Sequence, residues 1–172
     1  MRLICLFIFL AFSSPIVSSE ILFIERFSEG KSEGWQVSGK GDWLTTTYQG
    51  NFSYRLTNQK SATYKLAIGN VSKVTVTISA SAFDLEENDQ CIGEVSINKG
   101  RQWLPVLIFT DGGDDSLSVM TESATIQLES ATKELWVRLR ANGLNDYTNL
   151  IRPRRPDLDL CWFDNIIVSD YR

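Results

Sequence analysis

The chain has 172 residues, enough for one domain with a hydrophobic core, and carries 17 Lys and Arg against 21 Asp and Glu, a net charge of −4. This acidic balance disfavours a nucleic-acid partner, because affinity for phosphate backbones comes mostly from Lys and Arg. The absence of His excludes Ser-His-Asp and Cys-His nucleophiles and removes the usual imidazole ligands of zinc.

The first segment has the pattern of a secretory signal peptide. Arg2 supplies a positive flank, residues 3–12 are apolar, and Val17-Ser18-Ser19 fits a small-residue cleavage site. The apolar run is too short for a membrane span, which needs about 20 residues, and no later run is longer. We therefore predict a signal peptide at residues 1–19 and one exported domain at residues 20–172, whose net charge becomes −5 because Arg2 is removed.

From Ile21 onward the dominant hydrophobic period is two, which is typical of β-strands. In chain order the pattern predicts strands at residues 21–27, 35–38, 42–48, 52–57, 64–68, 72–83, 93–98, 103–109, 124–128, 134–140 and 160–168. Gly- and Asn-rich breaks such as 39–41, 98–100 and 142–143 supply the positive φ of tight turns. No amphipathic helix of ten or more residues is predicted, and short strands without helices indicate an all-β sandwich or barrel.

Two cysteines remain after removal of the predicted signal peptide, Cys91 and Cys161. An even pair in an oxidising compartment favours one disulfide, which would close a long loop. Two buried free thiols are the alternative.

Several stretches resemble the calcium-containing jelly-roll domains that occur as carbohydrate-binding modules and in related extracellular sandwiches. They are the early acidic strand followed by Gly34-Trp35, the hairpin pattern of residues 93–103, and the final strand Trp162-Phe163-Asp164-Asn165-Ile166-Ile167-Val168. The resemblance implies an antiparallel two-sheet β-sandwich of jelly-roll type, a carbohydrate ligand and a structural Ca²⁺.

The first and last strands each carry one acidic residue inside an apolar pattern, Glu25 and Asp164. A charge in a buried strand is costly unless it is paired or bound to a metal. The resemblance implies that these strands lie side by side and that both carboxylates bind Ca²⁺, with backbone carbonyls completing the shell. Glu29 is an alternative to Glu25, and Asp164 capping a turn or pairing with an arginine is the alternative to a metal site.

The aromatic residues are the best candidates for a ligand surface, because flat side chains match the apolar faces of sugar rings. Trp136 alternates with core-type residues and shares its face with Arg138, and Trp43 and Tyr48 lie in a threonine-rich strand. These four residues form the predicted glycan-binding set, whereas Trp35, Trp103 and Trp162 are expected in the core.

We therefore predict an exported, non-catalytic glycan-binding module. An extracellular protein-interaction domain without a sugar site is the alternative. A carboxylate-based glycan-cleaving enzyme, which needs two acids about 5–9.5 Å apart, is the third. Its candidate acids are Asp84, Glu86, Glu87, Asp89 and Glu94, and their spacing does not single out an acid and a base. The Arg-rich run of residues 152–156 could bind an anionic polysaccharide or a protein, although a solvated loop is the simpler interpretation.

Overall fold

The computed structural model describes residues 19–27, 32–39, 43–48, 51–56, 60–83, 85, 89–110, 118–142 and 160–171. Within these ranges the secondary structure consists of eleven β-strands, and no helix is present. The strands are β1 (Ile21–Glu25), β2 (Gln36–Ser38), β3 (Trp43–Tyr48), β4 (Asn51–Leu56), β5 (Ser61–Ala67), β6 (Lys73–Phe83), β7 (Gln90–Ser96), β8 (Leu104–Phe109), β9 (Ser118–Gln127), β10 (Glu134–Asn142) and β11 (Leu160–Asp170). Residues 1–18 of the predicted signal peptide, Glu29 and the Arg-rich run of residues 152–156 lie outside the described residues.

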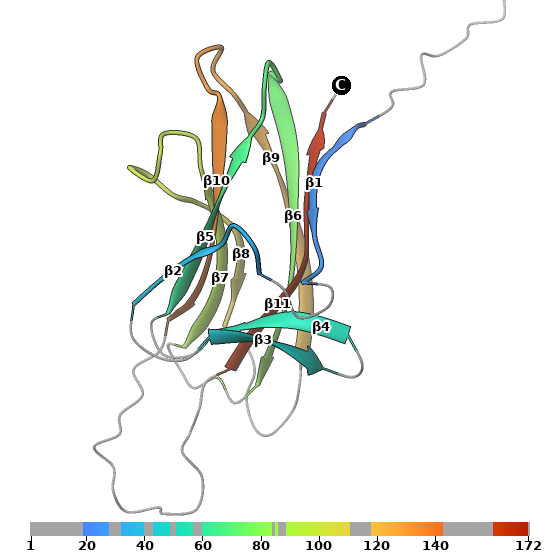
Figure 1. Ribbon diagram of the computed structural model, residues 1–172, viewed down its shortest axis with the longest axis vertical. Helices are drawn as coiled ribbons and strands as arrows, with labels where there is room; N and C mark the ends of the chain where they lie inside the picture. The colour runs from blue at the N-terminus through green and yellow to red at the C-terminus, as the bar shows by residue number, and fades with distance from the viewer. Residues whose placement is uncertain are drawn as a thin grey trace, which may run out of the picture.

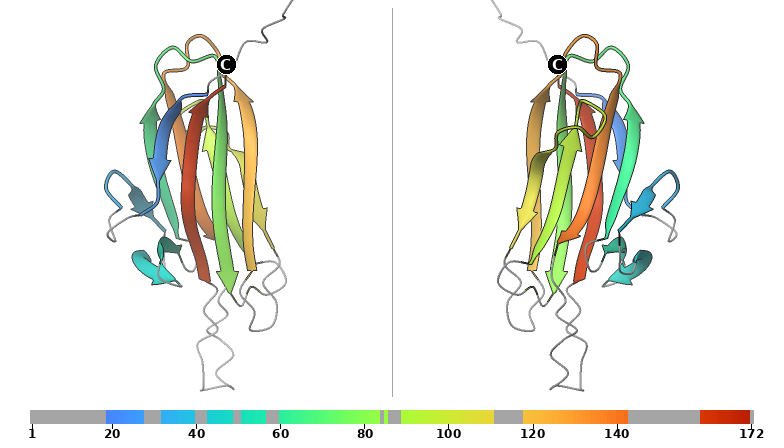
Figure 2. Two further views of the ribbon diagram at one scale, coloured as in Figure 1. Left: turned by 90° about the vertical axis from the view of Figure 1, so that its right-hand side faces the viewer. Right: turned by 90° about the vertical axis from the view of Figure 1, so that its left-hand side faces the viewer.

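The strands form two antiparallel sheets packed face to face (Figure 1). Sheet A has the order β3-β4-β11-β6-β9, with β1 also paired to β11, and sheet B has the order β2-β5-β10-β7-β8. Successive strands belong to different sheets throughout, except for β3 and β4 in sheet A and β7 and β8 in sheet B. This alternation makes the fold a β-sandwich of jelly-roll type and confirms the predicted fold class. The two faces of the sandwich appear separately in Figure 2.

The core lies between the sheets and follows the period-two pattern of the sequence. Val74, Val76 and Ile78 of β6 are fully buried, and every second residue of β10 faces them from sheet B. At Gly93 of β7 the sheets approach so closely that an added Cβ would lie 2.7 Å from the Cδ1 atom of Ile78. A glycine is therefore required at this point of sheet B by the packing rather than by a turn.

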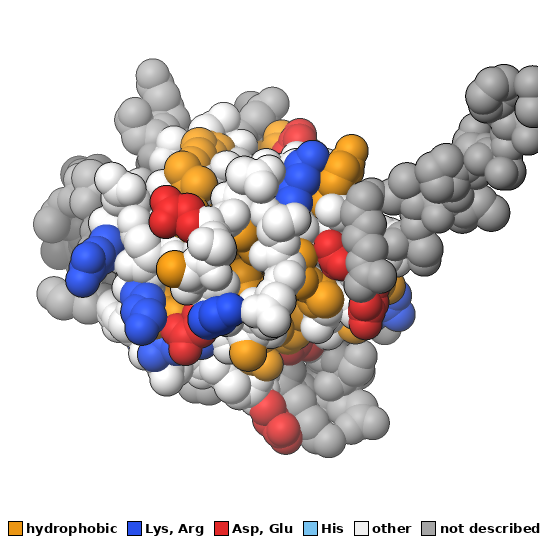
Figure 3. Space-filling model, turned by 90° about the horizontal axis from the view of Figure 1, so that it is seen from above, with side chains coloured by type: hydrophobic (Ala, Val, Ile, Leu, Met, Phe, Trp, Pro, Cys, Tyr) orange, Lys and Arg blue, Asp and Glu red, His pale blue; other side chains and the backbone are white. Residues whose placement is uncertain are grey.

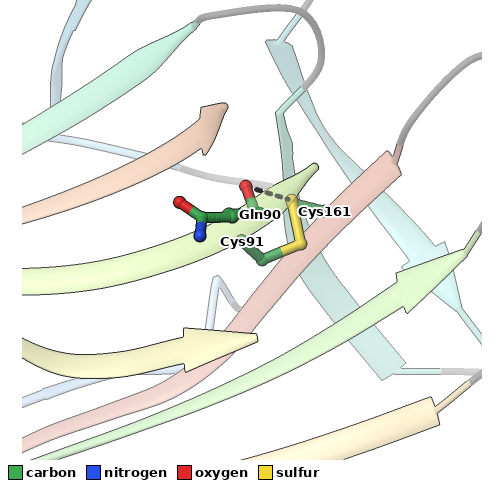
Figure 4. The surroundings of a disulfide bond; sticks show 3 residues. All are labelled: Gln90, Cys91 and Cys161. Atoms are coloured by element: carbon green, nitrogen blue, oxygen red, sulfur yellow. Dashed lines mark hydrogen bonds between the residues drawn. A yellow bond between two sulfur atoms is a disulfide. The ribbon is translucent and has the colours of Figure 1, made fainter. Parts of the chain in front are cut away.

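The predicted disulfide is confirmed: Cys91 of β7 is bonded to Cys161 of β11, with their Cα atoms 5.6 Å apart. The bridge joins sheet B to sheet A through the core, where both residues are buried (Figure 4). The Sγ atom of Cys161 also lies 3.8 Å from the carbonyl oxygen of Gln90. Because a disulfide sulfur carries no proton, this is a packing contact rather than a donated hydrogen bond.

The two ends of the described chain meet in sheet A, as the resemblance implied. One edge of β11 pairs with β4 over Cys161–Phe163 and then with β1 over Ile166–Ser169. Between these segments β11 bulges, and Asn165 has a positive φ of 49°. Asp164 lies where β11 changes partner: it is in register with Ser79 of β6 on one side, whereas on the other side it falls between the segments that pair with β4 and β1, just before the bulge.

The predicted core position is right for Trp35, which is 8 % exposed, and wrong for Trp103 and Trp162. Trp162 is half-buried because its neighbours Cys161 and Phe163 fill the core, which turns the residue between them to the outer face of sheet A. Trp103 lies before β8, in a hairpin outside sheet B. In the described ranges no helix is long and apolar enough to cross a bilayer.

Candidate functional site

The outer face of sheet B carries a dense group of charged, hydroxyl and aromatic side chains. Leu135, Val137 and Leu139 of β10 are fully buried, so the residues between them point away from the core. By strand register, this outer face carries Gln36 and Ser38 of β2, Ser61, Thr63 and Lys65 of β5, Glu134, Trp136, Arg138 and Arg140 of β10, and Ile92, Glu94 and Ser96 of β7. We call this set face B.

A buried carboxylate lies at the centre of face B. The side chain of Glu94 is 6 % exposed, and its Oε1 atom accepts hydrogen bonds from the Nε atoms of both Arg138 and Arg140, each at 2.6 Å. The two arginine side chains remain 25 % and 33 % exposed. One buried carboxylate therefore orients two guanidinium groups whose outer nitrogens lie nearer to solvent.

The hairpin of residues 97–103 folds over one end of face B. The Ser96 hydroxyl accepts a hydrogen bond from the Gly100 amide at 2.9 Å, and Asn98 Oδ1 accepts one from the Gln102 amide at 2.9 Å. Lys99 and Gly100 both have positive φ, 60° and 80°, which makes the turn tight. These bonds hold the hairpin in one conformation and position the residue that follows it, Trp103.

Two tryptophan rings lie close to this turn, both near Gly100. A Cβ atom added to Gly100 would be 3.3 Å from the rings of both Trp103 and Trp136, and the positive φ of 80° at this position also favours glycine. The guanidinium carbon of Arg138 lies 3.8 Å from the centroid of the Trp103 ring, and Lys65 Nζ lies 4.5 Å from that of Trp136. Each half-buried aromatic ring thus has a cation over one face.

The structure places two of the four predicted ligand residues together on face B. Trp136 is half-buried, and its Nε1 atom donates to Glu134 Oε2 at 3.2 Å, which orients the ring. Arg138 is its neighbour two residues along β10. Trp43 and Tyr48 belong to β3 of the other sheet, and their side chains lie outside the described part of the chain.

Sequence reasoning left Arg140 out of the predicted ligand set, and it missed both Trp103, which lies in the hairpin beside face B, and the central position of Glu94. The register between β7 and β10, which brings Arg138 opposite Glu94, is a long-range property. The period-two pattern alone predicted that Arg140 shares a face with Trp136. Of the acids considered for catalysis, Glu94 is ion-paired and Asp89 is buried, whereas Asp84, Glu86 and Glu87 lie outside the described residues.

The acids of the terminal strands lie near each other where β1 meets β11. Glu25 is paired in register with Ile166, and its carboxylate accepts from the Phe27 amide at 2.7 Å and from Trp35 Nε1 at 3.3 Å. Asp164 accepts from the amide and side-chain nitrogens of Asn165 at 2.7 and 3.0 Å.

Burial raises the pKa of Asp164, and the negative charge of Glu25 raises it further, while the Asn165 amide and Arg26 act in the opposite direction. No group of three or more Asp, Glu, Cys or His side chains suited to a metal occurs among the described residues. A cation held here would therefore need backbone carbonyls in addition to the two carboxylates.

No protein-family model matches the sequence, and no curated protein matches it. The fold does match solved structures. TmCBM61 in complex with β-1,4-galactotriose superposes with a TM-score of 0.55 at 13% identity, covering 84% of this chain and 94% of that one. The CBM22-2 xylan-binding domain of Xyn10C from Paenibacillus barcinonensis gives 0.53 at 15% identity, covering 87% and 99%.

An adhesin domain is also similar in fold. The K3 cleaved adhesin domain of Lys-gingipain from Porphyromonas gingivalis W83 gives a TM-score of 0.56 at 14% identity, covering 88% of this chain and all of that one (100%). At such identities the likeness is one of fold, and it agrees with the sandwich architecture implied by the sequence resemblance. These domains differ in what their names say they do, so function must be argued from the side chains of this chain.

Proposed function

We propose that this protein is an exported, non-catalytic glycan-binding module whose ligand lies on face B. The observation that carries the proposal is the pair of half-buried tryptophans, Trp103 and Trp136, whose rings both lie close to Gly100. Rigid aromatic rings offer apolar area to sugar faces with little entropy to lose. Other side chains of face B, including Thr63 and Gln36, supply hydrogen-bond donors and acceptors for sugar hydroxyls.

The fold likeness supports the same proposal. Two of the similar structures are named for galactotriose and xylan binding, and the disulfide between Cys91 and Cys161 is typical of exported proteins. Glu94 is already ion-paired with two arginines, so it is a poor candidate for the acid or base of a glycan-cleaving enzyme.

The test is binding of the protein lacking residues 1–19 to a panel of neutral and acidic oligosaccharides, measured by calorimetry. We expect saturable binding that Trp136→Ala or Trp103→Ala weakens by about tenfold or more, since each removes an aromatic contact. Trp162→Ala is the matched control, because this tryptophan is also half-buried but belongs to the outer face of sheet A. Equal loss in all three variants, or no binding across the panel, would contradict the proposal.

We also propose a structural Ca²⁺ at Glu25 and Asp164. The residues fit a hard cation: two carboxylates lie close together, and β11 changes partner at Asp164 and Asn165, which leaves this edge of the backbone without a registered partner strand. Bound Ca²⁺ would supply positive charge that compensates the burial of Asp164.

The test of this site is thermal unfolding with excess Ca²⁺ and with chelator. We expect Ca²⁺ to raise the melting temperature of the parent but not of Asp164→Ala, with the exposed acid Glu122→Gln behaving like the parent. An Asp164→Ala protein that gains as much from Ca²⁺ as the parent would show that the ion binds elsewhere or not at all.

An assembly domain is the second candidate, and one observation favours it. The edge strand β8 exposes Leu104 (48 %) and Ile108 (47 %), and Val119 of the neighbouring edge strand β9 is 68 % exposed. β8 contains no charged residue, although edge strands are commonly protected by charges. If light scattering shows a monomer at high protein concentration and the protein binds a glycan, self-assembly through these edge strands is ruled out.

A further inference from the structure

The charge of face B is opposite to that of the chain as a whole. Lys65, Arg138 and Arg140 outnumber the acids Glu94 and Glu134, and the hairpin above them adds the exposed Lys99 and Arg101. These five cations and two acids give a net charge of +3, on a chain whose net charge is −4. Figure 3 shows Lys and Arg side chains gathered on the left of the molecule, where sheet B lies, with acidic side chains between them.

Glu94 neutralises only one of the two arginines that it orients. Both Nε atoms donate to the same oxygen, Oε1, so the second positive charge has no carboxylate of its own at this point. Among the described residues, neither guanidinium donates a hydrogen bond to any other acceptor. Two oriented guanidinium groups with one surplus charge and free outer N–H groups form a ready site for an anion with two or more oxygens.

The neighbouring aromatic rings indicate what carries that anion. Arg138 lies over the ring of Trp103, and Trp136 lies two residues away on the same strand. A sugar stacked on either ring would bring substituents on its edge toward the arginines. The two arginine side chains are 25 % and 33 % exposed, so the positive charge that Glu94 does not neutralise is accessible to a ligand in solution.

We propose that face B binds an acidic glycan, in which a carboxylate or sulfate group of a sugar unit is held by Arg138 and Arg140 while neighbouring sugar rings stack on Trp103 and Trp136. This inference rests on the proposed glycan-binding function and names the ligand class.

The test compares oligosaccharides that differ in charge alone. The probes are tetramers of galacturonic, mannuronic and glucuronic acid, the same tetramers with their carboxyl groups methyl-esterified, and a sulfated tetramer of galactose beside its unsulfated form. We expect at least one acidic form to bind about tenfold or more tightly than its neutral partner, because charge-assisted hydrogen bonds to arginine are lost on esterification. Raising the NaCl concentration from about 50 to about 500 mM should weaken the acidic form only.

Arg140→Gln removes one guanidinium without touching Trp103, and we expect it to lower the affinity for the acidic form by about tenfold and so to reduce the ratio of acidic to neutral affinity. Lys73→Gln is the matched control, since this lysine lies in β6 of the other sheet, over Tyr171. Circular dichroism melting establishes that both variants fold.

The outcomes separate the inference from the proposed function. Neutral glycans that bind as well as their acidic forms would overturn the acidic-ligand inference and leave the glycan module standing. A poly-glutamate peptide that binds as tightly as the best acidic tetramer would overturn it in favour of an acidic protein ligand. No binding of any sugar would overturn both.

Discussion

The disulfide is expected to be the largest single covalent contribution to stability, and its effect can be calculated from the fold. Cys91 and Cys161 are separated by 70 positions and join the two sheets. Closing a loop of this length reduces the entropy of the unfolded chain by an amount worth about 4 kcal/mol at 25 °C. In domains of about 150–250 residues each kcal/mol shifts the melting temperature by about 2–4 °C, so loss of the bridge should lower it by about 8–16 °C.

The perturbation is the double variant Cys91→Ala/Cys161→Ala, compared with the parent by calorimetry with and without a thiol reductant. Both cysteines are buried, so the double variant also loses a little packing, and its melting temperature should fall at least as far as that of the reduced parent. Reductant should leave the double variant unchanged, which makes it the control. If the melting temperatures of the double variant and of the reduced parent both fall by less than about 3 °C, the entropic explanation of the stabilisation is wrong.

Three further predictions concern single side chains. Because burial raises the pKa of Asp164 above its ordinary 3.8, the folded state holds this proton more tightly than the unfolded chain, and the charged form destabilises the fold at neutral pH. In chelator, Asp164→Asn should therefore melt above the parent at pH 7, and the difference should shrink as the pH falls toward 3.8; a difference independent of pH would contradict this. Gly93→Ala should cost about 1–3 kcal/mol in urea unfolding, because its Cβ would lie 2.7 Å from Ile78, and an unchanged midpoint would show that the sheets move apart at no cost. Trp35→Phe should cost about 1–3 kcal/mol in the same assay, since it removes the hydrogen bond to Glu25 and part of a buried ring, and a loss below about 0.5 kcal/mol would contradict that role.

The strands were predictable from sequence because most of them have one buried and one exposed face. In β6 and β10 this alternation is regular, and both lie where the pattern predicted them. β5 and β7 begin at Ser61 and Gln90, ahead of the predicted positions 64 and 93. β9 differs most: it begins at Ser118 rather than Ala124, because its first half pairs with β6 although it lacks an alternating pattern. The length of β9 is determined by its pairing with β6, and the hydrophobic period of a sequence does not reveal such a pairing.

The candidate site was only partly predictable, because strand pairing and hairpin folding are not visible in the hydrophobic period. Alternation along β10 identified the outward direction of Trp136 and Arg138, which is a local property. The ion pairs of Glu94 depend on the register between β7 and β10, and the position of Trp103 depends on how a hairpin folds back over the sheet. The sequence alone predicts a core position for Trp103, because large aromatic side chains usually fill sandwich cores. Here Gly100 and its positive φ redirect the chain and leave Trp103 on the outer face.

The proposed ligand of face B is a glycan, and its position on the protein can be measured. The most direct measurement is an NMR titration of the isotopically labelled protein with the tightest-binding oligosaccharide, following backbone amide and tryptophan Nε1 signals. We expect the largest shifts in β10, β7 and the hairpin of residues 97–103, with the Nε1 signals of Trp103 and Trp136 among them. Shifts confined to the hydroxyl-rich outer face of β6 and β9, or to the edge strand β8, would contradict it and place the ligand elsewhere.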